Sequence, residues 1–230
     1  MKTIGMIGGM SWESTLTYYR LINETVNRQL GGFHSARCLL YSVDFDEIDR
    51  YQKNGEWERA GAVVAFAASR LEAAGADFIL ICCNTMHKVI AQIEAGISIP
   101  VLHIAEATAD EMESRGIRCA ALLGTRYTMT QDFYTAVFVR RGIDILVPDT
   151  EDIEIVNAVI YDELCRGVVS NQSRAEYVRI VEKLMRQGAQ GVILGCTEIG
   201  LLLRSADVTI PVFDTAIIHA TRAAMMAIGK

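Results

Sequence analysis

The chain has 230 residues, of which 51% are hydrophobic and 22% are charged, and this composition predicts one large globular domain or two smaller ones. The formal net charge is -6, with acidic and basic residues interspersed, so we expect neither nucleic acid nor an anionic membrane surface as a partner. No segment approaches the roughly 18 apolar residues needed to span a bilayer. We therefore expect a partner that is a small molecule.

The amino-terminal sequence MKTIGMIGGMSWES has only a short apolar run and lacks the pattern of a secretory signal. We therefore expect a cytoplasmic protein, in which thiols stay reduced. Under that expectation the six cysteines are buried thiols or reactive groups rather than disulfides.

Short runs rich in Ile, Val and Leu alternate with longer stretches of helical period, a pattern typical of strand-helix-strand units in a parallel sheet. Several of the expected helices end at a glycine, as helices often do. In chain order the pattern predicts a strand over 3–7, a helix over 15–30, a strand over 37–43, a helix over 58–74, strands over 78–82 and 118–123 separated by a helix over 104–115, helices over 131–140 and 173–187, and a strand over 191–194.

Two stretches of the first half recur, in the same order, in the second half. LEAAGADFILICCNTMH is similar to LMRQGAQGVILGCTEIG, and Cys83 and Cys196 are the same distance apart along the chain as Gly75 and Gly188. IPVLHIAEAT, at 99–108, is likewise similar to IPVFDTAIIHAT, at 210–221. The alternative is a chance likeness between two ordinary helix-strand units, which share composition in any case.

A duplication predicts an α/β fold of two similar open parallel-sheet, Rossmann-like domains related by pseudo-symmetry. Ligands bind beyond the carboxyl ends of the strands in such sheets. Facing halves would form an active-site cleft between them, with Cys83 and Cys196 on opposite walls.

Each of these two cysteines ends an apolar run and begins a polar motif, CNTMH for Cys83 and CTEI for Cys196. The polar residues suit a helix N-terminus, whose positive end lowers the pKa of a nearby thiol and so favours the reactive thiolate. A cysteine hydrolase would need a histidine beside its nucleophile. His87 is a candidate partner for Cys83, but Cys196 has no counterpart, so the pair favours a 1,1-proton transfer by two opposed acid-base groups.

The remaining cysteines are interpreted as packing residues, since cysteine is among the most often buried residue types. Cys82 should point to the opposite face of its strand from Cys83. A zinc site is not favoured, because the cysteines lack the usual paired ligand spacing. The packing group comprises Cys38, Cys82, Cys119 and Cys165.

Two turns are candidates for substrate binding. In IGMIGGMSWEST the glycine spacing does not match a dinucleotide loop, so we expect the backbone amides of Met10 and Ser11 to receive a substrate carboxylate. The GTRYTM turn is its counterpart in the second half. There Thr125 and Thr128 either bind substrate or cap a helix.

The motifs IGMIGGMSWEST, CNTMH and GCTEIG resemble, in order, those of the aspartate/glutamate racemase family, and the resemblance runs from Met1 to about Ala220. It implies a pyridoxal-independent racemase without cofactor or metal, usually a homodimer. The implied domains comprise residues 1–100 with 210–230, and residues 101–209. Cys83 and Cys196 would be the acid-base pair, and the implied substrate-site residues are Asn84, Thr85, Thr197 and Glu198.

The substrate is less well defined by this resemblance. Aspartate-specific relatives hold the distal carboxylate with an Arg and a Lys, whereas the corresponding stretches here read FDEIDRYQK and YDELCRG. Arg50, Gln52 and Arg166 are candidate replacements, and of these we favour Gln52. Aspartate or glutamate is the expected substrate; the alternatives are a broad-specificity amino-acid racemase, related chemistry on another α-carbon acid such as a hydantoin, and a non-catalytic amino-acid-binding protein.

Overall fold

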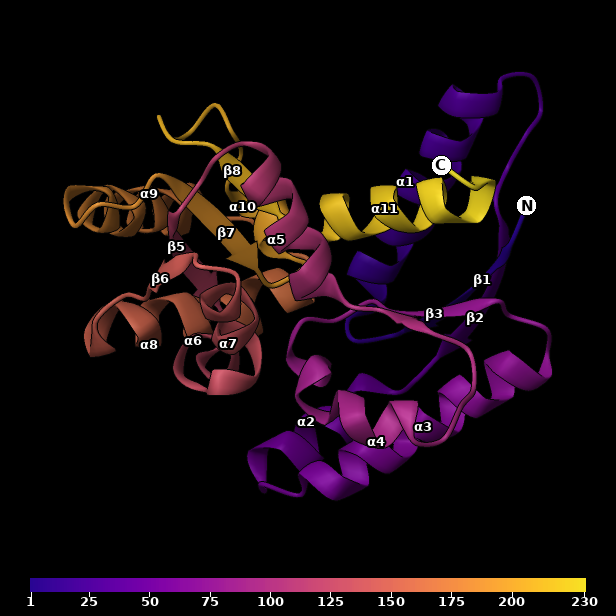
Figure 1. The fold of residues 1–230 in the computed structure, drawn as a ribbon. Coiled ribbons are helices and arrows are strands. Elements are labelled where there is room, and N and C mark those ends of the chain that lie inside the picture. Colours follow the sequence, from indigo (N-terminus) through magenta and orange to yellow (C-terminus); the bar gives the residue numbers. More distant parts are fainter. The chain divides into compact units, whose positions relative to one another are not determined.

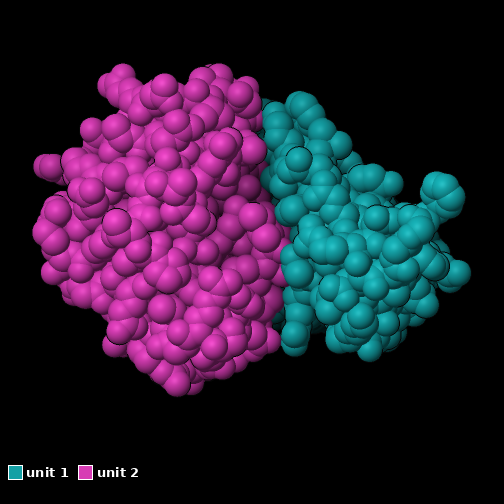
Figure 2. All heavy atoms as spheres, turned by 90° about the horizontal axis from the view of Figure 1, so that it is seen from above, with its two compact units in different colours: residues 1–103, 219–230 teal, residues 104–218 magenta.

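The computed structural model of the protein describes residues 1–230, which separate into two compact units (Figure 2). Unit 1 comprises Met1–His103 and His219–Lys230, and unit 2 comprises Ile104–Ile218. From the sequence, the chain was expected to return to the first domain at residue 210, whereas it returns to unit 1 at His219. The reason is that strand β8, Val212–Asp214, pairs with β7 of unit 2, so the chain returns only after β8.

Unit 1 contains a four-stranded parallel sheet of order β2-β1-β3-β4. Helices α1 and α11 lie on one side of this sheet, and α2, α3 and α4 lie on the other (Figure 1). The elements are β1 (Thr3–Gly8), α1 (Trp12–Leu30), β2 (Arg37–Ser42), α2 (Phe45–Lys53), α3 (Trp57–Ala73), β3 (Phe78–Ile81), the 3-10 helix η1 (Thr85–Val89), α4 (Ile90–Glu94), β4 (Val101–Leu102) and, from His219 onward, α11 (Thr215–Ile228).

The two central strands of unit 1, β1 and β3, are hydrophobic on both faces because helices cover both faces of the sheet. All four residues of β3, FILI, are buried, and β1 is buried from Ile4 onward. The returning α11 closes the unit, and the backbone amide of Lys2 donates to the carbonyl of Ala227 at 2.8 Å.

Unit 2 repeats this architecture with a parallel sheet of order β6-β5-β7-β8. Its largest buried side chains belong to one apolar core around β5 and β7. The elements are α5 (Ile104–Ser114), β5 (Cys119–Gly124), α6 (Arg126–Thr130), α7 (Asp132–Arg140), β6 (Asp144–Leu146), α8 (Thr150–Ala158), the π-helix η2 (Val159–Glu163), the 3-10 helix η3 (Leu164–Arg166), α9 (Asn171–Arg186), β7 (Gly191–Gly195), α10 (Ile199–Leu202) and β8.

The two sheets have equivalent strand orders. In each sheet, the first strand in the chain lies between the second and the third. The fourth strand pairs with the third and forms the edge of the sheet. The predicted α/β class with two similar open parallel sheets is therefore confirmed. Cys83 follows β3 and Cys196 follows β7, so the two cysteines lie beyond equivalent strands.

None of the helices is both long enough and apolar enough to cross a membrane.

Candidate active site

The turn after β3 carries Cys83. The amide of Cys82 still bonds to the Ile7 carbonyl at 2.9 Å, so the sheet extends to Cys82 and the chain leaves it at Cys83. Cys82 is fully buried, and burial raises the pKa of its thiol. Cys83 keeps 8% of its surface exposed and packs in the apolar core with Met10 and Met86. This placement suits a group that meets a ligand beyond the strand end.

The turn after β1 is closely packed. Gly9 has φ of +91°, and a side chain there would meet the backbone of Val43. Ser11 caps α1, because its Oγ accepts from the amide of Ser14 at 3.4 Å and its carbonyl accepts from the Thr15 hydroxyl at 2.8 Å. Met10 and Ser11 are each 3% exposed. The Oγ of Ser11 is therefore the acceptor that caps α1.

Gln52 lies beside the Cys83 turn although the two are far apart in sequence. It is buried near the end of α2, and its Nε2 lies 3.2 Å from the Met86 sulfur. Asn84 and Thr85 are also buried, but the side chain of Asn84 forms no cap on η1. The structure thus brings the expected residues of unit 1 together at the carboxyl end of its strands.

In unit 2, Cys196 is paired with an acidic neighbour. Its Sγ donates to Oε2 of Glu198 at 3.0 Å, and the hydroxyl of Thr197 donates to the same oxygen at 2.9 Å. All three residues are buried. Burial, and then the charge of Glu198, raise the pKa of Cys196 well above that of an ordinary thiol. Cys196 therefore holds its proton at neutral pH.

The expectation that a helix N-terminus lowers the pKa of this thiol is wrong for Cys196. The helix that follows, α10, has only four residues, and Glu198 does not cap it with its side chain. The carboxylate instead accepts a hydrogen bond from the thiol, which keeps its proton. Desolvation and a like charge therefore outweigh any effect of so short a helix.

Thr125 has a structural partner in the second-half turn. Its Oγ1 accepts from the amide of Thr128 at 3.3 Å and lies 3.0 Å from the Thr128 hydroxyl, so Thr125 caps α6. It is 5% exposed. Thr125 was expected either to bind substrate or to cap a helix, and these hydrogen bonds are those of a helix cap.

Tyr134, on α7, was not indicated by the sequence. Its hydroxyl is buried and has no hydrogen-bond partner, while burial and then the nearby Cys196 raise the pKa of the phenol. A buried polar atom without a partner carries a desolvation cost of about 1–3 kcal/mol. Its sequence context, QDFYTAVF, has only a helical apolar pattern, so no local signal marks this hydroxyl.

We expect Tyr134→Phe to leave the stability unchanged or to raise it by about 1 kcal/mol, because the substitution removes an unsatisfied buried group. Tyr177→Phe is the matched control. The Tyr177 hydroxyl is buried too, but it donates to the Val156 carbonyl at 2.9 Å, so this variant should be destabilised. Urea unfolding of both variants measures the difference. If Tyr134→Phe were as unstable as Tyr177→Phe, the conclusion that the Tyr134 hydroxyl has no hydrogen-bond partner would be contradicted.

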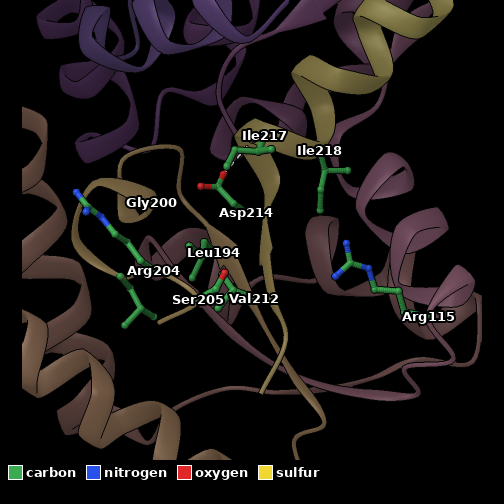
Figure 3. Close-up of a pocket in the computed structure, with 10 residues that line it drawn as sticks. Arg115, Leu194, Gly200, Arg204, Ser205, Val212, Asp214, Ile217 and Ile218 are labelled. Carbon is green, nitrogen blue, oxygen red and sulfur yellow. Dashed lines mark hydrogen bonds between the residues drawn. The ribbon is translucent and has the colours of Figure 1, made fainter. Parts of the chain in front are cut away.

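A cavity of about 230 Å³ lies within unit 2, at the ends of β7 and β8 (Figure 3). Asp214, on its wall, caps α11 by accepting from the amides of Ala216 and Ile217 at 2.9 and 3.2 Å. Gly200 also lines the cavity, and any side chain there would collide with the Asp214 carboxylate. None of the expected site residues lines this cavity, so we do not assign it to the candidate active site.

Comparison with known proteins identifies relatives over nearly the whole chain. The broad specificity amino-acid racemase RacX of Bacillus subtilis (strain 168) is 26% identical over 217 residues, covering 93% of this chain and 92% of that protein. A solved structure of a candidate Asp/Glu racemase from Yersinia pestis is 52% identical, with a TM-score of 0.92 and coverage of 99% of this chain and 100% of that one. An aspartate racemase homologue from Pyrococcus horikoshii OT3 is 37% identical, with a TM-score of 0.86 and coverage of 99% of each chain.

Together with the fold, these similarities identify the protein as a racemase, which is a type of isomerase. The family model for Asp/Glu/Hydantoin racemase matches residues 7–223. The chain therefore belongs to the Asp/Glu/hydantoin racemase family.

Proposed function

We propose that the protein is a cofactor-independent amino-acid racemase in which Cys83 and Cys196 transfer protons at Cα. The observation that carries this proposal is the pair of nearly buried cysteines beyond equivalent strands, β3 and β7, of two sheets with the same strand order. Membership of the racemase family supports it.

The proposed chemistry needs one thiolate and one thiol. The thiolate takes the α-proton, so the C–H bond breaks and its electron pair stays on Cα, while the opposite thiol delivers a proton to the other face. The raised pKa of Cys196 suits the donor role, and Glu198 orients its proton. In the reverse direction the two cysteines exchange roles. The proposal therefore requires both thiols to reach one bound substrate.

The other residues of the proposed site bind and orient the amino acid. We assign the substrate carboxylate to the backbone amides of Met10 and Ser11, because backbone N–H groups at a helix start favour an anion. Gln52 is proposed to contact the substrate side chain. Contacts to the remainder of the substrate are assigned to Asn84, Thr85, Thr197 and Glu198, and to Thr125 in addition to its role as the cap of α6.

Aspartate, or glutamate, is the first substrate we propose. Two features favour a broader specificity as the second candidate: the expected Arg and Lys anchors are not evident, and RacX, to which this chain is similar, is a broad specificity amino-acid racemase. Incubation with L-aspartate in heavy water, without added cofactor, tests the proposal by NMR of the α-proton and by chiral chromatography. Exchange with formation of D-aspartate is expected.

Other outcomes of this experiment separate the alternatives. Exchange and inversion of other amino acids but not of aspartate would favour the broad-specificity racemase. Calorimetric binding of amino acids with no exchange of any α-proton would contradict the proposal and favour a binding protein.

We further propose a homodimer, located in the cytoplasm, in which the six free cysteines remain reduced. Helix α1 buries one face and exposes an apolar stripe on another, where Trp12, Leu16 and Tyr19 are 62%, 59% and 54% exposed. Such stripes mark interaction surfaces, and a two-fold dimer pairs one surface with itself. A second copy of this chain is the occupant we propose.

We expect Leu16→Arg to shift the dimer toward monomer, because the substitution places a charge in the centre of this stripe. Light scattering after gel filtration measures the mass. Val139→Arg is the control, since Val139 is equally exposed but lies on α7. A wild-type monomer at micromolar concentration, or equal dissociation of both variants, would refute the assignment.

A further inference from the structure

Three of the four histidines lie together in unit 1, and we call His87, His103 and His219 the histidine cluster. The ring centroid of His87 is 4.5 Å from that of His103 and 6.1 Å from that of His219. They come from three elements: η1, the segment after β4, and α11. His87 and His219 are fully buried.

Hydrogen bonds determine which nitrogen of His219 carries the proton. Its Nε2 lies 2.8 Å from the Leu102 carbonyl, which only accepts, so Nε2–H is the donor. Its Nδ1 lies 2.9 Å from the hydroxyl of Tyr18 and accepts from it. Burial lowers the pKa of His219 to about 3, so this ring stays neutral and its orientation is set at both ends.

His87 is directed at the Cys83 turn. Its Nδ1 lies 2.8 Å from the carbonyl oxygen of Cys83, so Nδ1–H donates to that carbonyl. Burial, followed by the charges that His103 and His219 would carry, lowers the pKa of His87 well below its ordinary value. The ring is therefore a neutral donor, packed against the other two imidazoles.

This bond orients the peptide that joins Cys83 to Asn84. In a trans peptide the C=O and N–H point in opposite directions. With the carbonyl held toward His87, the amide of Asn84 points away from the histidine cluster. A rotated peptide would exchange the positions of a hydrogen-bond donor and an acceptor next to Cys83, which would change the electrostatic environment of its thiol.

We propose that His87 is a positioning residue for Cys83, acting through the Cys83 carbonyl, and that Tyr18 and His219 hold His87 in place. The inference rests on the proposed function of Cys83 as a proton-transfer group. It differs from a Cys-His nucleophile pair, because the imidazole nitrogen bonds to the backbone of the cysteine turn.

Two conservative variants of His87 form a matched pair. Asparagine places its amide nitrogen near the position of Nδ1 and can keep the bond to the Cys83 carbonyl, whereas glutamine places its amide near Nε2 and cannot. We expect His87→Gln to lower kcat about tenfold with little change in KM, and His87→Asn to stay within about threefold of the wild type.

Alkylation of Cys83 by iodoacetamide, followed against pH and located by fragmentation mass spectrometry, is the second measurement and needs no substrate. We expect the pH profile of Cys83 to shift in His87→Gln but not in His87→Asn. Tyr18→Phe, which keeps the ring but removes the hydroxyl, should shift the profile in the same direction and by less.

The outcomes distinguish this inference from the proposed function. A protein that racemises no substrate but shows the expected alkylation profiles would refute the racemase proposal and keep the positioning role of His87. Equal behaviour of the glutamine and asparagine variants in both measurements would overturn the positioning role. If the His87 variants do not fold, an unshifted Cys83 profile in folded Tyr18→Phe overturns it.

Discussion

Substitution of either Cys83 or Cys196 by alanine is expected to reduce racemisation by about 10²–10⁴-fold, the usual contribution of a positioned acid-base group. Each variant should nevertheless exchange the α-proton of one enantiomer with solvent, because the remaining thiol still faces one side of Cα. The enantiomer that exchanges should differ between the two variants. Deuterium incorporation into L- and D-substrate, followed separately by NMR, measures this.

Cys119→Ala is the matched control for these variants. Cys119 is a partly buried cysteine at the start of β5, and the turn that carries Thr125 follows the other end of this strand. We expect substitution of Cys119 to leave racemisation unchanged. Full activity in Cys196→Ala together with loss in Cys83→Ala would rule out the two-base mechanism. Exchange of the same enantiomer by both variants would do so as well.

Glu198→Gln is expected to lower kcat/KM by about tenfold or more and to move the ionisation of Cys196 to lower pH. Burial is the main cause of the raised pKa of Cys196 and is unchanged by the substitution. The charge of Glu198 is the next cause, so removing this charge favours the thiolate and lowers the pKa of Cys196. Activity should fall because a neutral amide is a weaker hydrogen-bond acceptor than the carboxylate and orients the thiol proton less well.

Two measurements check this expectation. The rate of Cys196 alkylation should reach half of its maximum at a lower pH in Glu198→Gln than in the wild type. The fall in kcat/KM should be equal in both directions, since the two enantiomers have equal free energy in water. Glu24→Gln, at a half-exposed position on α1, should behave like the wild type. An alkylation profile that stays in place or moves to higher pH would show that Glu198 does not raise the pKa of Cys196.

Much of the fold could be predicted from local patterns. Apolar runs located β1, β3 and β7 to within one or two residues, and helical periodicity located α3, α5 and α9 equally well. The expected start of the first helix at residue 15 is late, because Ser11 caps it and α1 begins at Trp12. The short elements β6, α6 and α10 were not predicted, since a few residues are too few to show a period.

The candidate site, too, was predicted from the sequence only in part. The internal repeat located both cysteine motifs, because equivalent elements carry similar local sequences. The sequence did not indicate that Gln52 contacts Met86, or that Tyr134 buries its hydroxyl without a partner. Such contacts join residues on different elements, and no local pattern records them.

By itself, the sequence determined the alternation of strands and helices, the two similar halves and the two cysteines that follow equivalent strands. These features depend on neighbouring residues, whose spacing sets which face of an element is buried. The tertiary structure alone decided the protonation of Cys196 and the grouping of His87, His103 and His219. Both depend on desolvation and on partners in space, since a pKa or a hydrogen bond is set by what surrounds a group after the chain has folded.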